Sequence, residues 1–324
     1  MTPTTTVSDH GRPRLGISRC LLGDEVRHDG GHKRSRYATD ELGKYVDWVS
    51  MCPEVEAGMS TPRPSLRLVR GPDAPRMITT STGEDWTDRM NSYSRAQVEV
   101  LQDDGIDGFV LKKDSPSCGM ERVRLYDDNG MPSRDGRGLF AGVLLDRFPS
   151  LPVEEEGRLN DHRLRECFVT RIFAYQRWRE FLRQDPTPAK LVQFHTSHKY
   201  LLLAHSPALY YQLGPQVAEA GSGDFQDRLA GYETDFMKAL ANPAPAKRHV
   251  NVLQHLCGFL KEQLDSPAKQ ELLQVIESFR EGIVPLIAPL TLLNHHLRQI
   301  DHPWVGQQRY LDPYPSELAL RSVI

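Results

Sequence analysis

Three cysteines in the first half of the chain are the residues whose type and surroundings favour chemistry. Cys20, Cys52 and Cys118 each follow a run of residues with β-strand character, and each stands in a polar segment rich in glycine or proline. Thiolates bind soft metals, and three of them without a fourth protein ligand leave one coordination position open. The cysteines therefore predict a metal centre with an open position.

The spacing of these cysteines is not diagnostic by itself. Intervals of 32 and 66 residues match no short zinc or ferredoxin motif, and single cysteines are commonly buried as small apolar side chains. The flanking residues favour ligation, because Ser115-Pro116-Ser117-Cys118-Gly119 predicts a rigid turn that presents a thiolate outward. Cys167 and Cys257 lie in helical patterns, and we interpret them as structural.

Short strands alternate with helical patterns over the first part of the chain. The strand-like runs are 15–18, 46–50, 65–69 and 108–111, and the helical patterns are 86–103 and 138–145. This alternation predicts a three-layer α/β domain over residues 1–150 with a mainly parallel sheet. Because the carboxyl ends of parallel strands meet at one edge, we expect the three cysteines to converge there.

The rest of the chain predicts helices. Residues 151–188 are interpreted as a linker with an arginine-rich helix, and 189–324 as an all-α bundle with helices at 189–204, 207–220, 224–241, 247–263, 267–281 and 286–299. Seven arginines between Arg158 and Arg183 stand against three acidic residues. Such a helix either contacts phosphates or is a solvated face with short-range ion pairs.

Composition limits the class of protein. The 324 residues are 39% hydrophobic and carry a net charge of −3, so no global positive field indicates a nucleic-acid binder. No apolar run approaches the length of a membrane span, and the first residues lack the features of a signal peptide. These observations predict a cytoplasmic protein, in which cysteines are expected as thiols or metal ligands rather than disulfides.

Three separated segments resemble, in order, the motifs of the TudS-like thiouracil desulfidase family. They are Cys20-Leu21-Leu22-Gly23 with Val26-Arg27-His28-Asp29-Gly30, Cys52-Pro53-Glu54 with Thr61-Pro62-Arg63, and Lys112 with Ser115-Pro116-Ser117-Cys118-Gly119. One departure is Ala57-Gly58-Met59-Ser60, where the family often has Gly-Gly before Thr-Pro-Arg. The resemblance implies a 4Fe–4S cluster held by Cys20, Cys52 and Cys118, and a non-redox desulfuration of a thiolated pyrimidine.

The second half resembles the YbgA-type helical domain. The resemblance rests on residues 194–206, 247–255, 283–287 and 308–315. A desulfidase domain fused to such a module is similar to bacterial desulfidases that convert 4-thiouridine in tRNA to uridine and release sulfide. The expected partner is therefore a tRNA that contains 4-thiouridine.

The expected reaction needs a base and a proton donor near the cluster, and residues close to the cysteines are the candidates. Glu54 is the expected general acid or base and Ser115 is expected to orient water or protonate the ring, although Glu54 could instead cap a helix and Ser115 shape a turn. The expected substrate contacts are Arg27, Asp29, Arg63, Lys112 and Ser117. The expected RNA contacts are Arg165, Arg171, Lys199, Lys247 and Arg248.

Two alternatives remain open at this point. The first is a desulfidase that acts on free thiopyrimidines such as thiouracil, although a small base needs neither a basic helix nor an appended bundle. The second is a non-enzymatic RNA-binding protein in which the cysteines hold a structural metal. A structural zinc site normally has four ligands, and the sequence offers no convincing fourth.

Overall fold

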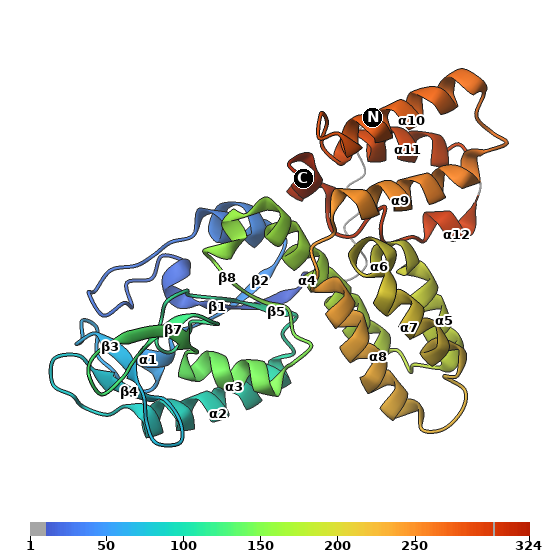
Figure 1. Ribbon diagram of the computed structural model, residues 1–324. Coiled ribbons are helices and arrows are strands. Elements are labelled where there is room, and N and C mark those ends of the chain that lie inside the picture. The colour runs from blue at the N-terminus through green and yellow to red at the C-terminus, as the bar shows by residue number, and fades with distance from the viewer. Residues whose placement is uncertain (1–10, 301) are drawn as a thin grey trace. The chain divides into compact units, whose positions relative to one another are not determined.

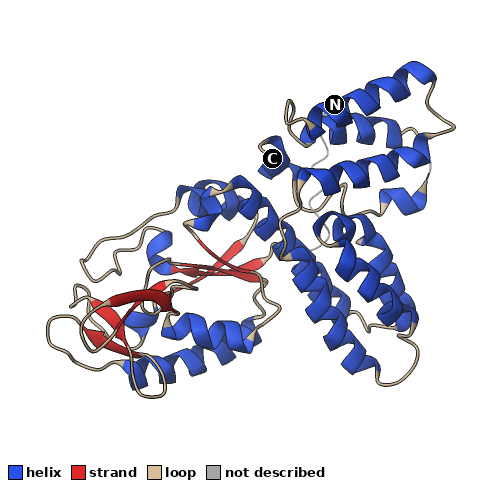
Figure 2. Cartoon of the chain, in the orientation of Figure 1, coloured by secondary structure: helices blue, strands red, loops and turns tan. Residues whose placement is uncertain are grey.

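The computed structural model describes residues 11–300 and 302–324, and it separates into two compact units (Figure 1). The first unit ends at Asn160 and the second begins at Asp161. Figure 2 shows the strands in the first unit and helices throughout the second. The predicted α/β domain followed by an all-α bundle is confirmed.

Among the described residues, the first unit contains two four-stranded sheets. The first has the order β2-β1-β5-β8, is parallel throughout, and is formed by β1 (Arg14–Ser18), β2 (Asp47–Met51), β5 (Gly108–Leu111) and β8 (Val153–Glu155). The second has the order β4-β3-β6-β7, is mixed, and is formed by β3 (Leu66–Val69), β4 (Arg76–Thr79), β6 (Val123–Tyr126) and β7 (Pro132–Gly136). The helices are α1 (Pro53–Glu56), α2 (Thr87–Asp104) and α3 (Leu139–Arg147).

The parallel sheet is built around its two central strands. Every residue of β5 is buried, which is the pattern of a strand covered on both faces. Phe109 of β5 packs against Phe140 of α3 with ring centroids 5.7 Å apart. Gly16 of β1 must be glycine, because a Cβ there would lie 2.1 Å from the Phe109 ring. This close packing fixes the ends of β1 and β5, from which two of the cysteine loops leave.

The mixed sheet is the main difference from the sequence-based expectation. The strand predicted at 65–69 forms β3 of this sheet rather than joining the parallel sheet. Strands β4, β6 and β7 were not predicted; the residues of β7 are mostly exposed and carry no apolar alternation. Strand β8 lies in the segment interpreted as a linker, and it extends the parallel sheet beside β5.

The second unit consists of consecutive helices. They are α4 (His162–Arg183), α5 (Pro188–Ser197), α6 (Lys199–His205), α7 (Pro207–Ala218), α8 (Phe225–Leu240), α9 (Ala246–Cys257), α10 (Ser266–Arg280), α11 (Ile287–Leu297) and α12 (Pro303–Gly306). Side chains that accept hydrogen bonds from the first turn mark five helix starts: Asp161, Thr187, Ser206, Asp224 and Asp265. The helix predicted at 189–204 is two helices that meet at His198.

Aromatic side chains form much of the core of this unit. Trp178 of α4 is fully buried, lies with its ring centroid 5.2 Å from that of Tyr232 of α8, and donates a hydrogen bond of 2.7 Å from Nε1 to Glu233.

Among the described residues, no helix has both the length and the apolar composition needed to cross a membrane.

Four histidines of the second unit are buried: His195, His198, His205 and His249. Burial lowers the pKa of all four rings, and that of His195 falls to about 4. The His195 Nδ1 atom lies 3.1 Å from the Tyr232 hydroxyl, so the neutral ring has a partner inside the bundle. His195 and His198 therefore both have polar contacts within the bundle.

These histidines make the protein acid-sensitive. Between about pH 6.5 and pH 4 the unfolded chain binds protons that the folded rings do not, so the free energy of unfolding decreases as the pH falls through this range. From the shift of His195 alone we expect a loss of about 2 kcal/mol between pH 7 and pH 5. Urea titrations followed by helical circular dichroism at both pH values measure it. The decrease in the free energy of unfolding between pH 7 and pH 5 should be smaller in His195→Gln than in the wild type. It should equal that of the wild type in His162→Gln, because the His162 ring is exposed. Equal losses in the wild type and His195→Gln would refute the assignment.

Candidate active site at the edge of the parallel sheet

The parallel sheet brings the three cysteines to one edge. Cys20 follows β1 in a short turn, Cys52 follows β2 directly, and Cys118 ends the loop that leaves β5. Strands β2, β1 and β5 are adjacent and parallel, so their carboxyl ends lie side by side. All three cysteines are buried free thiols, and all three line one cavity of about 370 Å³. The expected convergence is present.

The cavity wall carries mostly charged and polar side chains. Besides the cysteines, its lining includes Ser18, Arg19, Arg27, His28, Lys33, Glu54, Arg63, Ser65, Lys112, Lys113, Asp114 and Ser115. Six of these residues are arginine or lysine and two are acidic. In the described part of the chain, no group of three or more His, Cys, Asp or Glu is placed to hold a single metal ion.

The pKa values of all three thiols are raised in this arrangement. Burial, followed by the nearby Glu54 carboxylate, raises the pKa of Cys20 to about 11 and that of Cys52 to about 12. The pKa of Cys118 is raised well above its ordinary value, again by burial first and by Glu54 second. Binding of a metal centre must therefore displace thiol protons, so its uptake becomes more favourable as the pH rises.

Short-range contacts hold Cys52 in place. It caps the start of α1, and its backbone N–H donates a hydrogen bond of 2.9 Å to the Glu56 carboxylate. The Tyr93 hydroxyl of α2 donates to the other oxygen of Glu56 at 2.5 Å. The capping carboxylate is thus Glu56, which leaves Glu54 free for the cavity.

Glu54 is the centre of a hydrogen-bond network beside the thiols. Its Oε1 atom accepts hydrogen bonds from Ser117 Oγ at 2.5 Å and from Ser115 Oγ at 3.3 Å, and its Oε2 atom lies 3.4 Å from the Cys52 thiol. The Ser115 hydroxyl also lies 2.9 Å from that of Ser117 and accepts the Cys118 N–H at 3.2 Å. The two predicted catalytic residues therefore share one proton network that reaches two of the three cysteines.

Arg63 closes the other side of this network. Its Nη2 atom lies 3.9 Å from Glu54 Oε2, and both side chains are nearly buried, with 7% and 13% of their areas exposed. The Nη1 atom donates to the Val26 and Ser60 carbonyl oxygens at 2.9 and 3.3 Å. The Nε atom is buried and has no hydrogen-bond partner in the described structure. Arg63 therefore holds Glu54 and retains one donor.

Lys112 and Arg27 are the remaining predicted substrate contacts on the wall. The Lys112 ammonium is paired with the Glu156 carboxylate, and its backbone N–H donates to Ser18 Oγ at 3.0 Å. Arg27 forms an ion pair of 3.4 Å with Asp29.

Two predicted substrate contacts are not on the cavity wall in the described structure. Ser117 is completely buried, and its hydroxyl contacts three residues that line the cavity: Glu54, Ser115 and Cys118. Asp29 is exposed, and its carboxylate is occupied by Arg27 and by the Gly31 N–H at 3.1 Å. That Ser117 and Asp29 contact the substrate stays a prediction, and neither side chain lines the cavity in the described structure.

The five predicted RNA contacts lie on three helices of the second unit. Arg165 and Arg171 are on α4, Lys199 begins α6, and Lys247 and Arg248 are on α9. Lys247 is exposed, whereas the Lys199 ammonium lies 5.4 Å from the Trp304 ring centroid. The Arg248 guanidinium donates to the His205 carbonyl oxygen at the end of α6, which is a structural contact.

Several wall residues were not predicted. Lys33 and Lys113 line the cavity, and Glu156 binds both the Lys112 ammonium and the Lys113 N–H, the latter at 2.7 Å. The signal for Glu156 was its place just after a strand of the parallel sheet, but that strand was hidden in a segment interpreted as a linker. Lys33 lies on the loop after Cys20 and carries no pattern of its own.

Comparisons with known proteins agree with the division of the chain into two units. The family model "2-thiouracil desulfurase" matches residues 15–156, and "protein of unknown function (DUF1722)" matches residues 199–315. The uncharacterized protein YbgA of Escherichia coli (strain K12) is 32% identical over 164 residues, which cover 50% of this chain and 97% of YbgA. The uncharacterized protein YbbK of Bacillus subtilis (strain 168) is 32% identical over 153 residues, 45% of this chain and 97% of YbbK.

One solved structure is also similar. It is the [4Fe-4S]-dependent thiouracil desulfidase TudS, with 31% sequence identity and a TM-score of 0.38 over 46% of this chain and 94% of the TudS chain. The family models and the two relatives confirm the resemblance of the first unit to the thiouracil desulfidase family and of the second to YbgA. The chain belongs to the 2-thiouracil desulfurase family through its first unit and to the YbgA-like family through its second.

Proposed function

We propose that the protein removes sulfur from 4-thiouridine in tRNA, at an iron–sulfur cluster held by Cys20, Cys52 and Cys118. The observation that carries this proposal is that the three thiols, Glu54, Ser115 and six cationic side chains line the same cavity. The reaction is a hydrolysis: the thiocarbonyl and water give a carbonyl and hydrogen sulfide, with no net change of oxidation state.

The donor set fits a 4Fe–4S cluster. Three buried free thiols line one cavity, and thiolates are the protein ligands of such clusters. Cys20, Cys52 and Cys118 would hold the cluster and leave one iron without a protein ligand. When bound, the cluster supplies a Lewis acid that accepts the departing sulfur.

The protein's own residues manage water and protons. In this proposal the Glu54 carboxylate takes a proton from the water that attacks C4 of the pyrimidine, and Ser115 orients that water; both residues line the cavity and are hydrogen-bonded to each other. Ser117 and Arg63 are positioning residues, because each holds one oxygen of the Glu54 carboxylate. The proton can then pass from Glu54 to the leaving sulfide or to the ring.

The charge of the wall favours a nucleotide substrate over a free base. The six cationic side chains on the wall are Arg19, Arg27, Lys33, Arg63, Lys112 and Lys113, and the two acidic ones are Glu54 and Asp114. Five of these cations have a carboxylate partner within the chain, and Lys33 has none among the described residues. Neutral thiouracil has no charge that could attract any of them, whereas every nucleotide of an RNA carries a phosphate. The second unit adds the surface that a polymeric substrate needs.

Competition between substrates tests this proposal. We expect kcat/KM for tRNA containing 4-thiouridine to exceed that for free 4-thiouracil by about 100-fold or more, because remote phosphate contacts contribute binding energy to the reaction. Sulfide release from each substrate at low and high salt measures it. The tRNA reaction should weaken as salt rises, while the reaction of the free base should change little. Equal kcat/KM values for the two substrates would favour the free-base desulfidase.

A further inference from the structure

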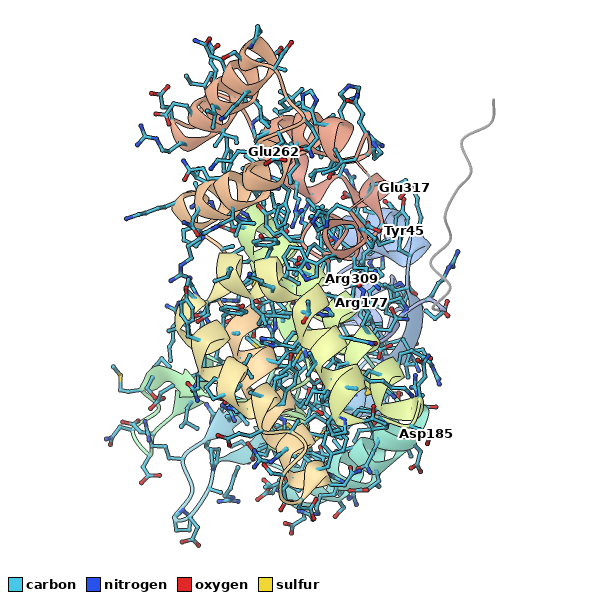
Figure 3. All side chains as sticks on the ribbon, turned by 90° about the vertical axis from the view of Figure 1, so that its right-hand side faces the viewer. Tyr45, Arg177, Asp185, Glu262, Arg309 and Glu317 are labelled. Carbon is cyan, nitrogen blue, oxygen red and sulfur yellow. The ribbon has the colours of Figure 1, made fainter. Side chains whose placement is uncertain are left out.

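Two arginines of the second unit lie together without enough acceptors. Arg177 of α4 and Arg309, which follows α12, are neighbours and interact as like charges (Figure 3). The Nη2 atom of Arg177 donates to the Pro313 carbonyl oxygen at 2.6 Å. Its Nη1 atom and the Nε atom of Arg309 are buried, and neither has a hydrogen-bond partner in the described structure. Each of these two neighbouring guanidinium groups therefore has a buried N–H donor without an acceptor.

His198 adds a third unpartnered nitrogen to the same place. Its side chain is almost fully buried, with 1% of its area exposed, and it interacts electrostatically with both Arg177 and Arg309. The Nδ1 atom must carry a proton, because its partner at 2.8 Å is the Phe194 carbonyl oxygen, which can only accept. The Nε2 atom is buried without a partner and can accept a hydrogen bond or a proton.

The charges around these groups do not balance. Among the described residues, Asp312 is the one carboxylate whose negative charge raises the pKa of Arg177. The Asp312 side chain is exposed. Burial and the neighbouring Arg309 together lower the pKa of Arg177 to about 9. Two buried or half-buried cations with unpaired N–H groups are costly for a folded protein unless an anion occupies them at least part of the time.

We propose that Arg177, His198 and Arg309 form a binding site for a phosphate group. The guanidinium donors match phosphate oxygens, and the free Nε2 of His198 suits an oxyanion that carries a proton. The group can come from inorganic phosphate or a phosphate monoester, or from the backbone of an RNA. The site lies in the second unit and is independent of the desulfuration proposed above.

Thermal unfolding in chloride and in inorganic phosphate, at equal ionic strength, tests the site. Phosphate should raise the Tm of the wild type by about 2–4 °C once its concentration is several times Kd. Arg309→Gln should lose this shift. In chloride the Arg309→Gln protein should have the same Tm as the wild type or a higher one, because the substitution removes the like-charge contact between Arg177 and Arg309. The matched control is Arg183→Gln on α4, whose side chain is 57% exposed and pairs with Glu180 at 3.5 Å.

A second arm distinguishes the source of the phosphate. Filter binding with tRNA that lacks 4-thiouridine compares the wild type, Arg309→Gln and Arg183→Gln. If inorganic phosphate gives no shift but Arg309→Gln binds this tRNA more weakly, the site takes a backbone phosphate. If phosphate shifts the Tm of Arg309→Gln as much as that of the wild type, the effect is that of an adventitious ion only and the proposal is wrong. It is also wrong if neither phosphate nor tRNA distinguishes Arg309→Gln from the wild type.

Discussion

Replacing Cys52 by serine is expected to abolish desulfuration and to lower the iron bound per chain. A serine hydroxyl is a poor ligand for iron at neutral pH, and Cys52 is one of only three thiols around the cavity of the described structure. Anaerobic purification followed by iron and sulfide assays, visible absorption and sulfide release from thiolated tRNA measures the effect. Cys20→Ser and Cys118→Ser should behave alike.

Cys257→Ser is the matched control for this experiment. Cys257 is a partly buried free thiol at the end of α9 in the second unit, away from the cavity wall. Its replacement should change neither the iron content nor the activity. An iron-free Cys52→Ser protein that kept full activity would rule out the cluster mechanism, while leaving the substrate proposal to the tRNA competition experiment.

Replacing Glu54 by glutamine is expected to lower kcat by about 10²- to 10⁴-fold while the iron content stays at the wild-type level. Glutamine can still accept the hydrogen bonds of Ser115 and Ser117, but it cannot take a proton from water. Single-turnover sulfide release from thiolated tRNA, with the iron assay on the same sample, measures both quantities.

Two further variants separate catalysis from structure. Glu25→Gln changes an exposed carboxylate on the loop after Cys20 and should leave kcat unchanged. Ser117→Ala removes one hydrogen bond that positions Glu54, so we expect a smaller loss than in Glu54→Gln. If Glu54→Gln keeps wild-type kcat, Glu54 is only part of the structure around Cys52, and another group must activate the water.

Much of the fold could be predicted because its signals are local. The strand at 108–111 and the helices near 86–103 and 267–281 coincide with β5, α2 and α10 within a residue or two, since apolar periodicity and capping residues act over short distances. The mixed sheet was missed because pairing between β3 and β6 joins residues far apart in the sequence. Strand β8 was missed because three residues are too few to show a period.

The candidate site shows the same difference between features set by local sequence and features set by long-range contacts. The sequence itself determined the candidate ligands and the candidate acid: three cysteines after strands, with Glu54 and Ser115 near two of them. Only the tertiary structure decided that Ser117 donates a hydrogen bond to Glu54, that Glu56 rather than Glu54 caps α1, and that Lys112 is paired with Glu156. The reason is physical: a residue's type and its neighbours in the chain limit its chemistry. Which polar groups are within hydrogen-bond distance depends on how parallel strands meet at the sheet edge.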